Sequence, residues 1–370
     1  MRALIVRFLE KPSNQPKQLR IPVARAIFAD YVQALSMANG FNLAIAGATG
    51  AVGAELIKLL EEGDLPVKNL KFLASARSAG KELKFRGESL AVEELKQDSF
   101  SGVDLAFFSA GAGTSREFVP AAVKQGAIVV DNSSAFRMDP DVPLVIPEIN
   151  PDDARAHRGK IAVPNCTTIV ALMALYPLHK AFKVNRVVAA SYQAVSGAGA
   201  KAIAELKSQT EAYLAGEPLK QSVFPHPIAF NVLPQVDIFL ESGYTKEEEK
   251  FRNESRKIMH HPTFRASITC VRVPVFRSHS VALSAEFARP VSVDQARDVL
   301  AKAPGIDLVD DPGRSEYPMP LTCSGKKECA VGRLRIDWAF ENGLAFWSCG
   351  DQLLKGAALN ALQIAELVLR

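Results

Sequence analysis

Between residues 41 and 164 the chain alternates short apolar runs with segments of helical spacing. Residues 41–46 are almost entirely apolar, a glycine-rich turn follows them, and apolar positions recur at helical intervals over 54–60. Three further apolar runs end in small or polar residues, at 70–73, 103–108 and 127–130. Strands without a polar face are typical of a parallel sheet that helices cover on both sides. The pattern therefore predicts an α/β fold with a doubly wound parallel sheet.

After residue 165 the pattern changes to longer strands with helices between them. A helical segment at 167–182 precedes β-rich stretches, at 186–193, 267–275, 280–288 and 334–338. Apolar positions over 352–369 have the spacing of an amphipathic helix. We therefore predict one domain over 37–164, a mixed α/β domain over 165–350, and a C-terminal helix over 351–370 that packs back on the first domain.

Residues 1–36 share neither pattern. They hold three prolines, six Lys or Arg and only two acidic residues. A transit peptide is one interpretation, although two serines are few for such a segment. We favour an upstream start codon or a disordered tail, with the functional protein beginning at Met37.

Charge and cysteine usage exclude several classes of protein. Removing residues 1–36 from the totals of 44 basic and 40 acidic residues leaves 38 of each, so we expect no nucleic-acid surface. The longest apolar run has ten residues, too few to cross a bilayer, and no membrane partner is expected. The five cysteines form no CxxC pair, which predicts reduced cytoplasmic thiols and no metal site.

Three glycines at intervals of three follow the first strand. Glycines in such a turn let the backbone approach a pyrophosphate, and the helix N-terminus offers it free N–H groups. The spacing is a variant of the dinucleotide fingerprint in the required strand–turn–helix context, with a plain tight turn as the alternative. We predict a Rossmann-type site formed by Gly47, Thr49, Gly50, Ala51, Val52 and Gly53.

The residues after the second strand indicate which dinucleotide is bound. An acidic side chain there would hold the ribose 2′-hydroxyl of NAD, but residues 74–78 contain none. Instead, Arg77 stands between the hydroxyls of Ser75 and Ser78, a combination that suits a 2′-phosphate. This favours NADP over NAD, with a solvated surface loop as the alternative.

A candidate nucleophile, Cys166, stands directly before the helical segment at 167–182. A helix N-terminus can lower a cysteine pKa from about 8.5 to roughly 3.5–7.5, and its N–H groups can stabilise an oxyanion. We therefore expect a reactive thiolate, with a buried structural thiol as the alternative. Further polar candidates are Gln193, which ends a strand before a glycine-rich turn, and the pair Arg272 and His279, seven residues apart around another strand.

Six motifs in order make the sequence similar to a known family. They are GATGAVG, DNSSAFR, PNCTT, SYQAVSGAG, GYTKEEEK and RVPVFRSHS. From Met37 onward the chain resembles aspartate-semialdehyde dehydrogenase. The resemblance implies an NADP-dependent homodimer that interconverts L-aspartate 4-semialdehyde and 4-phospho-L-aspartate, with inorganic phosphate as a reactant. It also implies a place in lysine (diaminopimelate), threonine and methionine biosynthesis.

The resemblance also implies roles for particular side chains. Cys166 would form the thiohemiacetal and thioester, His279 would take the proton, and Gln193 would orient the adduct. The implied substrate-binding residues are Arg137, Asn165, Glu247, Lys250 and Arg272, and Ser196 and Gly197 join the cofactor site.

Within this set, the resemblance assigns Arg272 to the α-carboxylate and Glu247 to the ammonium of the substrate. Arg137 and Lys250 would bind phosphate. From the residues alone, Glu247 and Lys250 would be part of a solvated charge run.

Two alternatives remain open from the sequence. A related enzyme, either N-acetyl-glutamyl-phosphate reductase or a glyceraldehyde-3-phosphate dehydrogenase, would use the same cysteine and histidine. A non-catalytic NADP-binding sensor would keep the fold without needing a reactive thiol.

Overall fold

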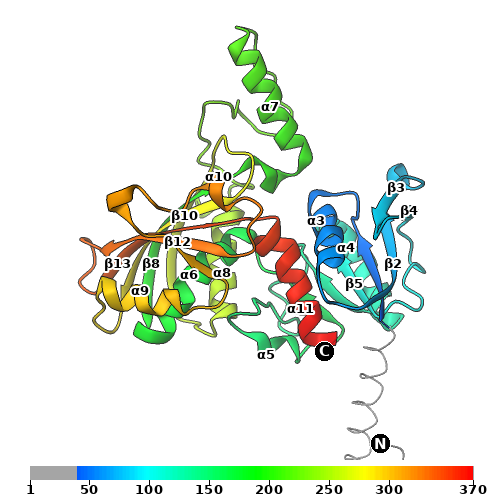
Figure 1. The fold of residues 1–370 in the computed structure, drawn as a ribbon, viewed down its shortest axis with the longest axis horizontal. Helices are drawn as coiled ribbons and strands as arrows, with labels where there is room; N and C mark the ends of the chain where they lie inside the picture. Colours follow the sequence, from blue (N-terminus) through cyan, green and yellow to red (C-terminus); the bar gives the residue numbers. More distant parts are fainter. Residues whose placement is uncertain (1–39, 370) are drawn as a thin grey trace, which may run out of the picture.

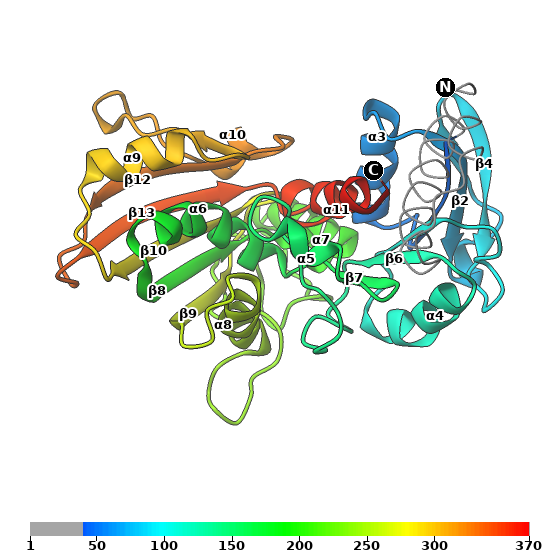
Figure 2. The same cartoon turned by 90° about the horizontal axis from the view of Figure 1, so that it is seen from below.

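The structure is a computed structural model that describes residues 40–369. The interpretation of residues 1–36 as an extension therefore falls outside the described residues. One sheet of seven strands and one of six organise the chain. They stand side by side, with the C-terminal helix between them (Figures 1 and 2). This confirms the predicted fold class, a Rossmann-type sheet followed by a mixed α/β domain.

The first sheet has the order β3-β4-β2-β1-β5-β6-β7. Its strands are β1 (Phe41–Ala46), β2 (Val67–Ala74), β3 (Glu82–Phe85), β4 (Glu88–Glu94), β5 (Leu105–Phe108), β6 (Ile128–Asp131) and β7 (Lys160–Ala162). All neighbours are parallel except the β3–β4 hairpin at the edge. Because the apolar side chains of β1 and β5 are buried, both strands lie inside the domain.

The strand order reverses at β1. Helix α3 (Ala51–Glu62) leads from β1 to β2 on one side, and α4 (Ala112–Lys124) leads from β5 to β6 on the other. Right-handed connections then place the two helices on opposite faces of the sheet. In sheets of this kind, ligands bind at the carboxyl ends of the strands where the order reverses.

The second sheet has the order β11-β12-β13-β10-β8-β9 and mixes parallel with antiparallel pairs. Its strands are β8 (Val184–Gln193), β9 (Arg265–Arg272), β10 (His279–Phe287), β11 (Ile306–Leu308), β12 (Cys329–Ile336) and β13 (Gly343–Gly350). Helices α6 (Cys166–Phe182), α8 (Lys246–Ile258) and α9 (Val293–Ala301) pack against it. The other face exposes Val188 and Tyr192 of β8.

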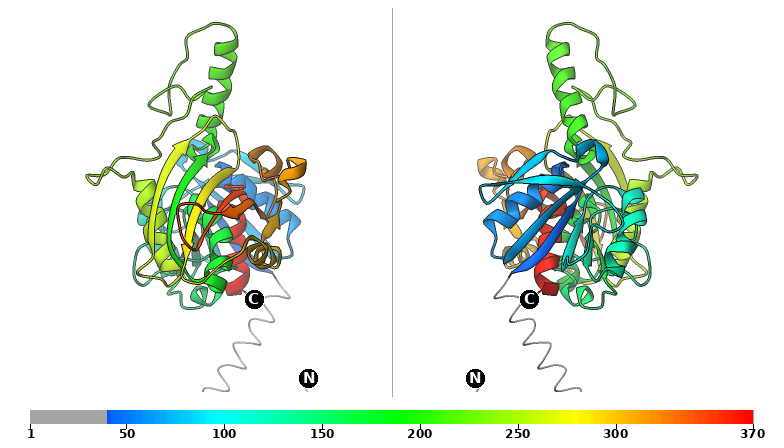
Figure 3. Two further views of the ribbon diagram at one scale, coloured as in Figure 1. Left: turned by 90° about the vertical axis from the view of Figure 1, so that its left-hand side faces the viewer. Right: turned by 90° about the vertical axis from the view of Figure 1, so that its right-hand side faces the viewer.

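Helix α7 (Ala200–Leu214) projects from the body of the molecule (Figures 1 and 3). The buried carboxylate of Glu205 accepts hydrogen bonds from Ser222 and from the backbone N–H of Val223, which fixes the returning chain against the helix. Short elements complete the fold: α5 (Pro151–Ala154), α10 (Pro320–Cys323), η2 (Ala76–Ser78), η3 (Val195–Ala198) and η4 (Pro312–Arg314).

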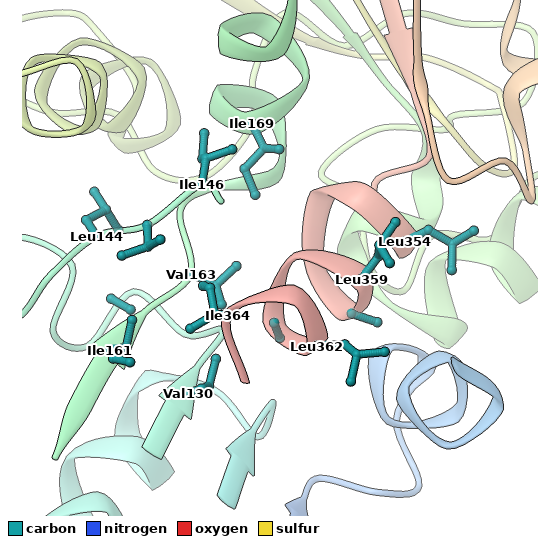
Figure 4. Packing of buried hydrophobic residues seen from close by; sticks show 14 of the residues in the cluster. Val130, Leu144, Ile146, Ile161, Val163, Ile169, Leu354, Leu359, Leu362 and Ile364 are labelled. Carbon is teal, nitrogen blue, oxygen red and sulfur yellow. The ribbon is translucent and has the colours of Figure 1, made fainter. Parts of the chain in front are cut away.

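The C-terminal segment differs from the predicted amphipathic helix in two ways. It begins with a π-helical turn, η5 (Leu354–Ala358), before α11 (Leu359–Leu369). Most of its residues are buried, because α11 packs against α3, α5 and strand β6 of the first sheet. Figure 4 shows Ile364 near Val163 and Val130, with Leu362 on the side of α3.

Candidate active site

A cavity of about 560 Å³ lies where the two domains meet. The first domain contributes the turn after β1 and the ends of β5 and β6, and the second contributes the start of α6, the end of β8 and the start of β10. All eight predicted catalytic and substrate-binding residues line it: Cys166, His279, Gln193, Arg137, Asn165, Glu247, Lys250 and Arg272. Residues more than 140 positions apart in the sequence thus share one cavity.

The predicted cofactor residues divide into two groups. Those that line the cavity are Gly50, Ala51, Val52, Ser196 and Gly197, and those that do not are Gly47, Thr49, Gly53, Ser75, Arg77 and Ser78. Gly47 has φ +91°, and a Cβ there would lie 2.4 Å from the carbonyl oxygen of Ser109. A Cβ on Gly53 would lie 2.5 Å from the carbonyl oxygen of Gly47. These two glycines therefore keep the turn narrow, so that Gly50 can present its backbone to the cavity.

Two further observations fit a dinucleotide at this turn. Helix α3 begins at Ala51 without a side-chain cap, which leaves first-turn N–H groups for an anion. The side-chain amide of Asn132 lines the same cavity, and its nitrogen and oxygen are both buried with no hydrogen-bond partner among residues 40–369. Buried polar groups are rarely left unpaired, so these atoms are suited to a ligand.

Helix α6 begins at Cys166, with Asn165 as its N-cap. The Oδ1 atom of Asn165 accepts hydrogen bonds from the backbone N–H groups of Thr167 (3.0 Å) and Thr168 (3.3 Å). On the other side, a Cβ added to Gly356 of η5 would lie 3.0 Å from the Cβ of Cys166. The cap and this close packing fix the half-buried thiol at the cavity wall.

The thiol of Cys166 does not have the lowered pKa expected from its place at a helix N-terminus. Burial and then the negative charge of Glu247 raise its pKa to about 11, although Arg137 and Arg272 act in the opposite direction. Loss of solvation of the thiolate therefore outweighs the partial positive charge of the helix end. The thiol is protonated at neutral pH and would have to lose its proton to act as a nucleophile.

We expect alkylation of Cys166 by iodoacetamide to accelerate about tenfold per pH unit between pH 6 and 9 in protein without nucleotide. Only the thiolate reacts, and below the pKa its fraction rises in that proportion. Mass spectrometry of the Cys166 peptide would give the rate, with Cys166→Ala reporting the background from the other four thiols. A plateau near neutral pH would contradict the raised pKa.

Glu247 is the centre of a hydrogen-bond network at the start of α8. Its Oε1 atom accepts from the side-chain amides of Asn165 (2.9 Å) and Gln193 (3.2 Å), and its Oε2 atom from Lys250 Nζ (3.0 Å). Lys250 also contacts Asp237 at 2.8 Å. Burial alone would raise the pKa of Glu247, but Lys250 and the two amides outweigh it and lower the pKa. The network therefore holds an ionised carboxylate against the start of α6, the helix that begins at Cys166.

His279 and Arg272 meet at the end of β8. His279 Nδ1 accepts a hydrogen bond from the backbone N–H of Ala194 (3.1 Å), so the neutral ring carries its hydrogen on Nε2. Nε2 has no partner among the described residues. Burial and the charge of Arg272 hold the pKa of His279 well below its ordinary value. A Cβ on Gly197 would lie 2.9 Å from Arg272 Nη1 and 3.1 Å from His279 Nε2, so the glycine gives both side chains room.

Arg137 reaches the cavity from the loop after β6. Its Nε donates to the carbonyl of Val163 (2.9 Å), its Nη2 to the carbonyl of Asn132 (2.9 Å), and its Nη1 to Glu254 Oε1 (3.0 Å). These bonds use three of the five guanidinium N–H groups and leave two for a ligand.

Several residues of the site or its support were not among the predicted site residues, and the most informative are Asp237, Gln352, Gly356 and Glu254. Gln352 lines the cavity, accepts from the backbone N–H of Ser278 (2.7 Å) and donates to Ser196. Loops bring Asp237 and Gln352 to the cavity, the π-helical turn η5 brings Gly356, and no spacing signal marks these three residues. Glu254 follows Glu247 by seven residues, a helical interval that could have indicated a shared face.

Two kinds of feature are absent from the described part of the chain. No group of three or more His, Cys, Asp or Glu side chains within residues 40–369 is placed to hold a metal ion. No helix in that range combines the length and apolar character needed to cross a bilayer.

Comparison with known proteins places this site in a family. Family models described as "Semialdehyde dehydrogenase, NAD binding domain" and "Semialdehyde dehydrogenase, dimerisation domain" match residues 42–157 and 175–355. The chain is 51% identical over 335 residues to aspartate-semialdehyde dehydrogenase of Aquifex aeolicus (strain VF5), covering 90% of this chain and 98% of that protein. It is 49% identical over 332 residues to the Synechocystis enzyme of the same name, with the same coverage.

Among solved structures, the chain is similar to aspartate semialdehyde dehydrogenase II of Vibrio cholerae complexed with ASA. The TM-score is 0.87 at 42% identity, and the match covers 90% of this chain and 98% of that one. These matches agree with the resemblance carried by the six motifs and with the two-sheet architecture. The chain therefore belongs to the aspartate-semialdehyde dehydrogenase family.

Proposed function

We propose that this chain catalyses the reversible, NADP-dependent phosphorylating oxidation of L-aspartate 4-semialdehyde to 4-phospho-L-aspartate. One observation carries the proposal: Cys166, His279 with its unpaired Nε2, and Arg137 with two guanidinium N–H groups left over all line a single cavity that also reaches Gly50 of the glycine turn. The proposed nucleophile, general acid–base group and anion site therefore share the cavity in which the dinucleotide would bind.

In the first step the sulfur of Cys166 bonds to the aldehyde carbon, and the thiol proton passes to the carbonyl oxygen to give a thiohemiacetal. The chemistry that bound NADP would supply here is a hydride acceptor for this carbon. The hydroxyl proton leaves toward His279, and the product is a thioester. A phosphate oxygen then attacks the thioester carbon, and the sulfur departs and regains a proton.

The hydrogen-bonding of His279 restricts how it acts in this sequence. With Nδ1 accepting from Ala194, the Nε2–H group is a donor to the oxygen on which charge develops. To accept the hydroxyl proton at Nε2, the neutral ring has to shift its hydrogen to Nδ1 and release the Ala194 contact. Its strongly lowered pKa fits a ring that is neutral between these events.

The charges of the cavity match those of the substrate. Arg272 uses Nη1 to hold the carbonyl of Ala194 (2.7 Å) and has further N–H groups for the α-carboxylate. Glu247 is assigned to the substrate ammonium, and Arg137 and Lys250 to phosphate. Asn165 and Gln193 hold the carboxylate of Glu247 next to the nucleophile.

NADP is the proposed nucleotide, and Arg77 is its proposed selector. Arg77 lies in η2, directly after β2, with an exposed side chain and no acidic neighbour between residues 74 and 78. Ser75 is exposed beside it, whereas Ser78 is buried.

Arg77→Ala should raise the KM for NADP by about tenfold to a hundredfold and change the KM for NAD little. A guanidinium–phosphate contact is a charge-assisted hydrogen bond, and only NADP offers the phosphate. Steady-state kinetics with both nucleotides would measure the effect, and Arg86→Ala, an exposed arginine of the β3–β4 turn, is the matched control. Equal losses for the two nucleotides would remove the 2′-phosphate role.

We also propose a cytoplasmic homodimer that acts in lysine, threonine and methionine biosynthesis. The family model over residues 175–355 is named for dimerisation. Exposed apolar side chains support an interface in this region: Val188, Tyr192, Phe230 and Phe239. Sedimentation equilibrium of the purified protein would test it, and a monomer at micromolar concentration would contradict it.

The deciding experiment is NADPH formation by purified protein with aspartate semialdehyde, NADP and phosphate, omitting each in turn. We expect turnover that requires all three and exceeds that with N-acetyl-glutamate semialdehyde. Preference for the acetylated glutamyl substrate would retain Cys166 and His279 but overturn the roles of Arg272 and Glu247. Tight NADP binding without turnover of either aldehyde would indicate a sensor.

A further inference from the structure

Glu254 is a buried carboxylate that has no part in the chemistry proposed above. Its side chain is 1% exposed, yet it does not line the cavity. It lies seven residues after Glu247 on α8, so the two share the helix face that packs against α6. A buried acid on an otherwise strongly polar helix needs partners, and both of its partners belong to the site.

Each carboxylate oxygen of Glu254 holds a different part of the cavity wall. Oε1 accepts from Nη1 of Arg137 at 3.0 Å, and Oε2 accepts from the backbone N–H of Asn165 at 2.6 Å. Asn165 is the residue directly before Cys166 and caps its helix. One side chain outside the cavity thus connects Arg137 to the backbone segment that leads into Cys166.

The same helix holds Asn165 at a second point. Its side-chain amide donates to Glu247, while its Oδ1 caps α6. Arg137 is similarly fixed, because its guanidinium also donates to the backbone carbonyls of Val163 and Asn132. Without Glu254, Arg137 would lose the one carboxylate that it contacts within residues 40–369, and the backbone N–H of Asn165 would lose its acceptor.

Stability alone gives little reason to bury this ion pair. Desolvating two charges usually costs about as much as their attraction returns, and apolar replacements of similar volume are often as stable. Burial accordingly raises the pKa of Glu254, against the opposing effects of Arg137 and the Asn165 N–H. What the pair does provide is a fixed orientation for two groups that face the cavity.

We infer that Glu254 is a positioning residue, which aims the two free N–H groups of Arg137 at the phosphate and sets the backbone that leads into Cys166. The identity of the anion as phosphate rests on the proposed function. The geometric part of the inference, that Glu254 acts through Arg137 and Asn165, rests on the contacts themselves.

The direction in which the KM for phosphate changes in Glu254→Gln distinguishes a positioning role from a purely electrostatic one. Glu254→Gln removes a negative charge near the anion site, so a purely electrostatic role predicts tighter phosphate binding. Glutamine, however, offers one oxygen to two donors, and its NH₂ group would face the other donor. If Glu254 positions Arg137, both Glu254→Gln and the shorter Glu254→Asp should raise the KM for phosphate tenfold or more, with a smaller change in the KM for aldehyde.

Glu249→Gln and Glu249→Asp are the matched controls, because Glu249 lies on the same helix with its side chain 44% exposed. These two variants should leave the KM for phosphate and the KM for aldehyde within twofold of the values of the parent protein. In an Arg137→Gln background, Glu254→Gln should raise the KM for phosphate little further, since its effect on phosphate binding passes through Arg137. An unchanged or lowered phosphate KM in folded Glu254→Gln would overturn the inference.

Calorimetric titration of inorganic phosphate into the full chain gives a readout that does not depend on turnover. We expect at least tenfold weaker phosphate binding to Glu254→Asp than to the parent protein, which covers the case in which Glu254→Gln fails to fold. If the parent protein binds phosphate but oxidises no aldehyde, the proposed function fails and the positioning role stands. If Glu254→Asp binds phosphate as the parent does, the positioning role fails, whatever the activity.

Discussion

Cys166→Ala should reduce the rate of NADPH formation by roughly 10⁴-fold or more, since the reaction would lose its covalent intermediate. The substitution removes only the sulfur atom. The Cβ that packs against Gly356 and the Asn165 cap of α6 both remain, so the fold and the nucleotide site should persist. Stopped-flow absorbance at the NADPH band would measure the rate, and fluorescence titration with NADPH would show nearly unchanged binding.

Cys323→Ala is the control for that result. Cys323 is a buried thiol in α10 and does not line the cavity, so its removal should leave turnover within a few-fold of the parent protein. Turnover that survives in Cys166→Ala would exclude the thiohemiacetal mechanism. Equal losses in both variants would indicate damaged folding instead.

The first sheet was predictable because its central strands are apolar on both faces. The expected strand at 127–130 is observed as β6 at Ile128–Asp131, and the glycine spacing after β1 marks the tight turn. The edge hairpin of β3 and β4 was missed, since six of its eleven residues are exposed and four of those six carry charge. Strand β13 was missed for the opposite reason, because a short apolar run between glycines has no period that distinguishes strand from helix.

The sequence predicted that Cys166 and His279 share a site, because each is a reactive residue type within a recognisable motif. It did not predict the partners of these residues that only the fold brings close to them. The run from Lys246 to Lys257 is almost entirely polar in sequence and would ordinarily be solvated. Its inner face becomes buried only because α8 packs across the start of α6, which turns Glu247 and Glu254 toward Asn165. The same burial explains the error over the Cys166 pKa, since a helix N-terminus says nothing about how far the thiol is removed from water.

A second polar network lies in the C-terminal segment, outside the cavity. Lys355 of η5 is 1% exposed, and its ammonium group donates to Glu148, to Asn360 (3.0 Å) and to Gln363 (2.7 Å). All three of its N–H bonds are therefore used. Because Glu148 belongs to the loop between β6 and β7, the network ties the π-helical turn beside Cys166 to the nucleotide-binding half of the chain.

Lys355→Met should lower the free energy of unfolding by about 3–5 kcal/mol, because it leaves the buried carboxylate of Glu148 without its cation. Urea denaturation followed by circular dichroism would measure the loss. Lys58→Met, which breaks an exposed pair with Glu62, is the matched control and should cost about 0.5 kcal/mol or less. The double variant Lys355→Met/Glu148→Leu should recover much of the loss, since an apolar pair leaves no buried charge unpaired. If Lys355→Met costs no more than Lys58→Met, the network does not hold the two halves of the chain together.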